Sequence, residues 1–166
     1  DYQAHQTSDD RIVVLKPPSY FENYATLFAP MADGPIRMVE LGIFEGGSAL
    51  LLAEMLPTAR IAAFDLRPPN PAVLRHVERM GYGDRIRLGY ETSQSDAAAL
   101  HAGITGFLGE EPIDIVIDDA SHHYDHTRNS FEILFPLLRP GGIYVIEDWA
   151  WAHWPATTFD SWQGTA

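Results

Sequence analysis

A regular alternation of apolar runs and helix-forming segments constrains the fold of this chain more than any other feature of its sequence. Five apolar runs are predicted to be strands: residues 36–41, 60–65, 85–88, 113–118 and 143–147. Helices are predicted between them, at residues 49–56, 71–80, 96–107 and 124–138. Continuous apolar strands separated by helices are typical of a parallel sheet covered on both faces, and right-handed crossovers make such a sheet doubly wound. We therefore expect an α/β fold with a Rossmann-like, mainly parallel sheet.

The segments on either side of this predicted core differ from it in character. Residues 1–35 are predicted to form an N-terminal arm and a helix over residues 20–28, because Ser19 and Glu22 have the spacing of a capping box. Residues 36–150 form the predicted core, and residues 151–166 form a tryptophan-rich C-terminal segment. The tryptophans at positions 149, 151, 154 and 162, with His153 among them, would either line an acceptor or pack onto the sheet edge or a subunit interface.

The composition excludes several classes of chemistry. The 166 residues include no cysteine, which excludes disulfides, cysteine-ligated zinc, iron–sulfur clusters and a thiolate nucleophile. Lys16 is the only lysine and no GxxxxGK[ST] segment occurs, so neither Schiff-base chemistry nor a P-loop is expected. The formal net charge of −12 argues against binding to nucleic acid or an anionic membrane, and it suits a cationic ligand or a divalent metal. Neither an apolar run of about 18 residues nor a signal-peptide pattern occurs, so we expect a cytoplasmic protein.

A glycine-rich segment, ELGIFEGGS at residues 40–48, joins the first predicted strand to its helix. Gly42, Gly46 and Gly47 would let the backbone turn sharply and approach a ligand, and the helix that follows offers free N–H donors. Asp65 ends the second strand, where an acidic side chain can accept hydrogen bonds from ribose hydroxyls. The pattern favours an adenosine ligand, although the glycines could also serve only as a tight turn and Asp65 only as a loop cap.

Carboxylates follow the fourth and fifth predicted strands. Asp118 and Asp119 close the fourth strand, with His122 three residues further on, and Glu147 and Asp148 close the fifth. Carboxylates that converge at neighbouring strand ends repel one another unless a cation lies among them, and oxygen ligands favour Mg²⁺. A neutral imidazole beside such an ion is a suitable general base near neutral pH. The sequence thus predicts a magnesium site with His122 as the base, unless the acidic groups are simply helix caps and solvated strand ends.

A site built on two histidines is the alternative at this position. His122 and His126 are four residues apart and share a face if a helix has already begun there. Such a site would leave the acidic pair at residues 147–148 without a role.

The segment at 40–48 followed by Asp65 resembles the cofactor motif of class I S-adenosylmethionine-dependent methyltransferases. The resemblance implies a role for Glu40 near the cofactor, for Asp65 at the ribose and, more weakly, for Gln94, Ser95 and Asp96 at the adenine. The residues that it assigns to the methionine half and its surroundings are Gly42, Gly46, Gly47 and Ser48.

The acidic motifs sharpen this resemblance. Asp-Asp-x-Ser-His after the fourth strand and Pro-Gly-Gly-x-Tyr-x-Ile-Glu-Asp at the fifth are similar to the metal-dependent sugar O-methyltransferases of macrolide biosynthesis and to the cephalosporin-hydroxylase-like family. The resemblance implies Mg²⁺ ligands at Asp119, Glu147 and Asp148, with His122 as the base and Asp118 facing the cofactor. Class I enzymes normally continue with a helix and an antiparallel hairpin, for which residues 148–166 are too few. We therefore expect a sheet truncated after the fifth strand, or a partner such as a second copy over that edge.

The function expected from these features is Mg²⁺-assisted methylation of a hydroxyl on a small natural product or sugar, with S-adenosylmethionine as the methyl donor. Two alternatives remain open. One is an oxidoreductase or a hydroxylase of the cephalosporin-hydroxylase-like kind, and the other is a binding module that has kept the cofactor but lost its acceptor site.

Overall fold

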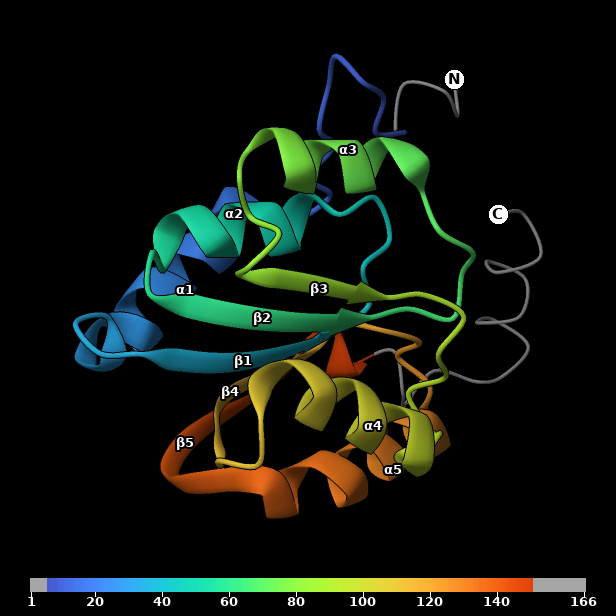
Figure 1. The fold of residues 1–166 in the computed structure, drawn as a ribbon. Helices are drawn as coiled ribbons and strands as arrows, with labels where there is room; N and C mark the ends of the chain where they lie inside the picture. The colour runs from blue at the N-terminus through green and yellow to red at the C-terminus, as the bar shows by residue number, and fades with distance from the viewer. Residues whose placement is uncertain (1–5, 151–166) are drawn as a thin grey trace.

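The fold centres on a five-stranded sheet, and the computed structural model describes it within residues 6–150. The strand order is β3-β2-β1-β4-β5 and every neighbouring pair is parallel. The strands are β1 (Ile36–Leu41), β2 (Ala59–Phe64), β3 (Ile86–Gly89), β4 (Ile113–Asp118) and β5 (Leu138–Ile146). The order reverses between β1 and β4, which confirms the predicted doubly wound α/β fold (Figure 1).

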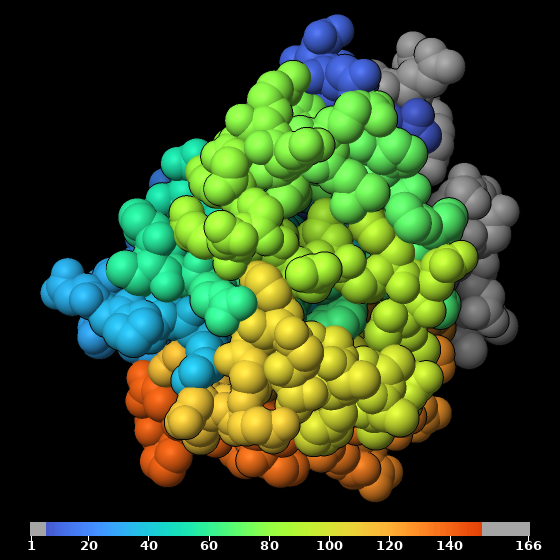
Figure 2. Space-filling view, in the orientation of Figure 1, coloured from blue at the N-terminus to red at the C-terminus, as the bar shows by residue number. Residues whose placement is uncertain are grey.

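Helices cover both faces of the sheet and enclose two separate cores (Figure 1). One face carries α1 (Pro18–Phe28), α2 (Gly47–Met55) and α3 (Pro71–Arg79), and the other carries α4 (Ala97–Leu108) and α5 (Tyr124–Leu134). Strand β1 supplies both cores because successive side chains point to opposite faces: Met38 packs with α1 and α2, and Val39 packs with α4. Figure 2 shows the side where β3 forms the sheet edge, between α3 and α4.

Two local predictions are wrong. Helix α1 begins at Pro18 without any side-chain cap, so Ser19 and Glu22 do not form a capping box; proline at the first helical position explains the start instead. Helix α5 ends at Leu134, short of the predicted residue 138, and a 3₁₀ helix, η3 (Phe135–Leu137), leads directly into β5. A second 3₁₀ helix, η2 (Ala29–Met31), follows α1.

Strand β5 starts earlier than the sequence predicts. The residues expected to form a turn before the strand lie instead within it, as an irregularity in its pairing with β4. Ile113 pairs with Leu138, whereas Ile115 pairs with Ile143, so the register shifts by several residues between them. Gly141, with φ of +76°, allows the backbone to bend there. The Pro-Gly-Gly segment that reads as a turn is therefore a bulge within the strand.

The N-terminal arm, residues 7–17, lies against the turn between β1 and α2. The backbone N–H of Thr7 donates to Glu45 Oε2 over 2.7 Å, and Val13 forms a parallel bridge with Gly46. A Cβ atom on Gly47 would lie 2.1 Å from the carbonyl oxygen of Val13, so only glycine permits this approach. The arm thus closes one side of the space beyond the carboxyl ends of the strands. None of the helices in the described part of the chain has the length and apolar character needed to span a bilayer.

Candidate functional site

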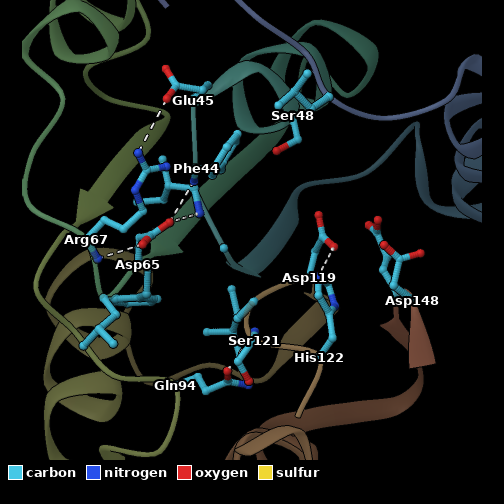
Figure 3. Close-up of a pocket in the computed structure, with 18 of the residues that line it drawn as sticks. Phe44, Glu45, Ser48, Asp65, Arg67, Gln94, Asp119, Ser121, His122 and Asp148 are labelled. Carbon is cyan, nitrogen blue, oxygen red and sulfur yellow. Dashed lines mark hydrogen bonds and ion pairs between the residues drawn. The ribbon is translucent and has the colours of Figure 1, made fainter. Parts of the chain in front are cut away.

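A pocket of about 610 Å³ lies beyond the carboxyl ends of the strands, where doubly wound sheets bind their ligands (Figure 3). It is lined by the arm, by the loops after β1, β2, β3 and β4, and by the end of β5. The candidate residues that line it are Gly42, Gly47, Ser48, Asp65, Gln94, Asp119, His122, Glu147 and Asp148. The candidates that do not line it are Glu40, Gly46, Ser95, Asp96 and Asp118. The structure therefore brings the glycine turn and the acidic cluster to one cavity.

Three residues with positive φ shape the glycine turn, namely Gly42, Phe44 and Gly46. Gly46 has φ of +76° and stands at the N-terminus of α2. Gly42 has φ of +95°, and a Cβ atom there would lie 2.2 Å from the backbone carbonyl oxygen of Asp119. The backbone N–H of Asp119 in turn donates to the carbonyl of Leu41 over 2.9 Å. Glycine at position 42 therefore permits the close contact that sets the loop after β4 against the loop after β1.

Asp65 holds the loop after β1 in place (Figure 3). Its Oδ2 accepts from the backbone N–H groups of Ile43, over 2.8 Å, and Phe44, over 2.7 Å. Its Oδ1 accepts from the backbone N–H of Arg67 over 2.8 Å. A carboxylate offers about four acceptor positions, so one remains for a ligand hydroxyl. Asp65 thus caps the loop and also faces the pocket, and its contact with a ribose stays a prediction.

Gln94 links the loops after β3 and β4. Its Oε1 accepts from the backbone N–H of Ser121 over 3.1 Å, and its Nε2 donates to Asp118 Oδ1 and to Ser130 Oγ. Asp96 caps α4 instead, because its side chain accepts from the backbone N–H of Ala99 over 3.0 Å. Of the three residues assigned to the adenine region, only Gln94 lines the pocket.

Asp118 differs from the expectation that it faces the cofactor. Its side chain is only 2% exposed and accepts a hydrogen bond from Ser130 on α5. Side chains alternate along β4, so Asp118 and Asp119 point to opposite sides of the strand end. Burial raises the pKa of Asp118 to about 6. In this structure its contact with the pocket is indirect, through Gln94.

Asp119, His122 and Asp148 can each place one ligand atom within 4.8 Å of the others (Figure 3). His122 Nε2 lies 3.8 Å from Asp119 Oδ1. His122 and Asp148 have backbone φ angles of +58° and +50°, which residues other than glycine rarely adopt. Such backbone strain concentrates at functional sites. The cluster contains a single histidine, so it gives no support to the two-histidine alternative with His126, which lines the same pocket separately.

Glu147, the third expected metal ligand, lies beside this cluster and is held by two residues that sequence reasoning missed. Its Oε1 accepts from the Lys16 ammonium and from the Tyr24 hydroxyl. Lys16 Nζ also lies 2.7 Å from Asp119 Oδ2, so it bridges the ends of β4 and β5. Burial, followed by the charge of Asp119, raises the pKa of Glu147, and Lys16 opposes that rise. The sequence did contain a signal for Lys16, because it is the only lysine in a chain whose carboxylates cluster after two predicted strands.

Glu40 lies beneath the cluster on the α2 face of β1. It is fully buried, and neither of its carboxylate oxygens makes a well-formed hydrogen bond among the described residues, although the Ser48 hydroxyl lies near enough to lower the pKa of Glu40. Burial raises its pKa to about 7, and the charge of Lys16 acts in the opposite direction. Glu40 was expected near the cofactor, but the turn after β1 separates it from the lining of the pocket.

We expect Glu40→Gln to stabilise the protein at alkaline pH. The folded state holds the Glu40 proton more tightly than the unfolded state, so stability falls as the pH rises from about 4.5 through about 7. The ionised carboxylate then costs about 3 kcal/mol, and the neutral amide removes this cost. Urea unfolding at pH 8.5 should show the gain and at pH 4.5 little difference. The exposed Glu22→Gln is the matched control, and a gain that does not depend on pH would contradict this account.

Trp149 is the one of the four tryptophans that lies within the described residues. Trp149 lies with its ring centroid 5.8 Å from that of Tyr124 at the start of α5. The tryptophans at 151, 154 and 162, together with His153, lie outside the described residues.

Comparison with known proteins adds independent evidence. A family model described as "Methyltransferase domain" matches residues 39–149. The chain is 58% identical over 146 residues to the demethylmacrocin O-methyltransferase of Streptomyces fradiae, which covers 84% of this chain and 34% of that protein. It is 36% identical over 140 residues to the mycinamicin VI 2''-O-methyltransferase of Micromonospora griseorubida, covering 80% of this chain and 32% of that protein. The chain thus spans about a third of the length of these relatives.

Solved structures agree with this result. A structure of the methyltransferase MycE in complex with Mg, SAH and mycinamycin VI has a TM-score of 0.59 and 32% identity, over 79% of this chain and 32% of that one. A structure described as a putative caffeoyl-CoA O-methyltransferase from Staphylococcus aureus has a TM-score of 0.67 at 12% identity, over 98% of this chain and 84% of that one. The second likeness concerns the fold alone.

Proposed function

Because the chain belongs to the methyltransferase-domain family, in the class I S-adenosylmethionine-dependent group, we propose that it is part of a Mg²⁺-assisted O-methyltransferase that acts on a sugar-bearing natural product. In this proposal residues 36–150 form the cofactor-binding core, and residues 7–17 of the N-terminal arm close one side of its pocket. The observation that carries the proposal is the single cavity lined by both the glycine turn and the acidic cluster. A relative from Streptomyces olivaceus, 34% identical and named as an 8-demethyl-8-alpha-L-rhamnosyl tetracenomycin-C 2'-O-methyltransferase, supports the choice of acceptor.

The donor set of the cluster fits a divalent ion. Carboxylate oxygens are the ligands that Mg²⁺ prefers, and Asp119 and Asp148 face each other across a space that a small ion can fill. In this proposal Asp119, Glu147 and Asp148 would hold the ion, which would supply Lewis-acid polarisation of the acceptor hydroxyl. The solved structure of MycE, described as a complex with Mg, supports the choice of ion.

His122 is the proposed general base. Its Nε2 lies 3.8 Å from Asp119 Oδ1, and its side chain lines the pocket at the acidic end. In the proposed reaction His122 takes the proton of the acceptor hydroxyl. Bound S-adenosylmethionine would supply the methyl group, which would exchange its bond to the sulfonium sulfur for a bond to the acceptor oxygen. Gln94, Asp65 and the glycine turn would orient the cofactor. Beyond proton removal by His122, the gain in rate would then come from alignment of the methyl group with the acceptor oxygen.

Calorimetric titration of the full chain with S-adenosylmethionine tests the cofactor assignment. We expect saturable binding, and we expect Asp65→Ala to weaken it by about tenfold or more, because a charged hydrogen bond and the order of the loop are both lost. Asp96→Ser, which keeps the helix cap outside the pocket, is the matched control and should bind like the wild type. Methyl transfer to a sugar-bearing macrolide such as mycinamicin VI then tests the acceptor class. Failure to bind S-adenosylmethionine, or oxygen-dependent turnover with Fe²⁺ in its place, would overturn the proposal.

A further inference from the structure

Lys16 connects the N-terminal arm to the acidic cluster. Its side chain is only 6% exposed, and its ammonium contacts carboxylates that follow two different strands, Asp119 after β4 and Glu147 after β5. Asp119 and Glu147 follow Lys16 by 103 and 131 residues in the sequence. A lysine this well buried is retained in a fold only when its charge is paired.

The backbone around Lys16 leaves it little freedom to move away. Val13, three residues earlier, forms a bridge with Gly46 on the turn after β1. Pro17 and Pro18, immediately after it, begin helix α1, whose Tyr24 donates to the same Glu147 oxygen. The ammonium is therefore delivered to the cluster from a fixed position, and α1 holds the other side of Glu147.

The charges around Lys16 do not balance without a further cation. Four carboxylates surround this end of the sheet: Glu40, Asp119, Glu147 and Asp148. Glu40 is fully buried and makes no well-formed hydrogen bond among the described residues, so an excess of negative charge beside it is costly. Even if Glu40 is left out of the count, one ammonium neutralises only one of the three remaining carboxylates. The remaining excess suits a divalent ion together with the positive sulfonium of the proposed cofactor.

We propose that Lys16 is a fixed cation that holds Asp119 and Glu147 together before any divalent ion binds, so that the fold does not depend on the ion. This inference rests on the proposed function for the identity of the ion, and it adds a positioning residue to the site. Without the ammonium, the carboxylates repel one another until an ion arrives. The ion would then contribute to folding as well as to the proposed reaction, because a ligand that binds only the folded state stabilises it.

The test is a comparison of Lys16→Met with the wild-type full chain. In EDTA we expect Lys16→Met to unfold at a lower temperature. Titration with MgCl₂ should raise its unfolding temperature more than that of the wild type, and calorimetry should show Mg²⁺ binding tighter by about tenfold, because a neighbouring positive charge has gone. Lys16→Arg keeps the charge and should resemble the wild type in both measurements.

Tyr24→Phe is the matched control because it removes an uncharged donor from the same Glu147 oxygen. It should lower the unfolding temperature without changing the response to Mg²⁺. Equal stability of Lys16→Met and wild type in EDTA, or an equal response of the two to MgCl₂, would overturn the inference. If Lys16→Met does not fold in EDTA, its recovery on refolding with MgCl₂ supports the inference, and no recovery overturns it. Failure of the proposed function appears separately, as loss of S-adenosylmethionine binding by the wild type.

Discussion

Asp119→Asn is expected to weaken Mg²⁺ binding by about 100-fold or more and to abolish metal-dependent methyl transfer. Asp119 links the acidic cluster to Lys16. It lies within reach of His122 and Asp148, and it also forms an ion pair with Lys16. Loss of a group that merely supports a metal ligand already costs 10–100-fold in affinity or activity, so loss of a ligand charge should cost at least as much. Asparagine keeps the size and one acceptor oxygen, so the fold should survive.

Calorimetry with MgCl₂, run beside calorimetry with S-adenosylmethionine, measures this effect. Cofactor affinity in the absence of metal should change little, because Asp65 and Gln94 lie in other loops. The matched control is Asp125→Asn, an exposed carboxylate in the first turn of α5. Unchanged Mg²⁺ affinity in Asp119→Asn would show that the ion, if it binds, has other ligands.

His122→Gln is expected to lower the rate of methyl transfer by about 10² to 10⁴, which is the range typical of general acid–base catalysis. Cofactor affinity should remain within about threefold of the wild-type value, since losing only the proton acceptor leaves ground-state binding intact. Single-turnover rates at saturating cofactor measure the first quantity, and calorimetry the second.

The pH dependence separates a base from a merely structural residue. A general base acts only in its unprotonated form, so the wild-type pH–rate profile should have an acid limb that is absent in His122→Gln. His101→Gln, on the exposed side of α4, is the matched control. Equal losses of turnover and cofactor affinity would contradict the assignment of His122 as the base.

The architecture was predictable because its signals are local. The five apolar runs, bounded by glycine and proline, correspond to the five strands of the sheet, and the bounds of β1 and β4 agree to the residue. The start of β5 was missed because Pro140, Gly141 and Gly142 carry the local signature of a turn, while pairing with β4 draws them into a bulged strand. Long-range pairing overruled local propensity there.

The candidate site was predictable in outline only. Parallel strands place their carboxyl ends at one edge, so the convergence of Asp119 with Asp148 followed from strand order and motif position. The orientation of Asp118 away from the pocket could have been found from side-chain alternation along β4. The loop-capping role of Asp65 could be raised only as an alternative, because its partners are backbone N–H groups of a loop whose path the sequence does not specify.

The amino-acid sequence by itself determined the parallel α/β sheet and the acidic edge at its carboxyl ends, since hydrophobic periodicity and strand-end position are properties of short segments. Only the tertiary structure decided which charges meet. Lys16 reaches Glu147 across 131 residues of sequence, and Glu40 ends up fully buried without a well-formed hydrogen bond in the described part of the chain. Both outcomes depend on how the arm, α1 and two strands pack together, and burial and pairing of charge are set by that packing rather than by neighbours along the chain.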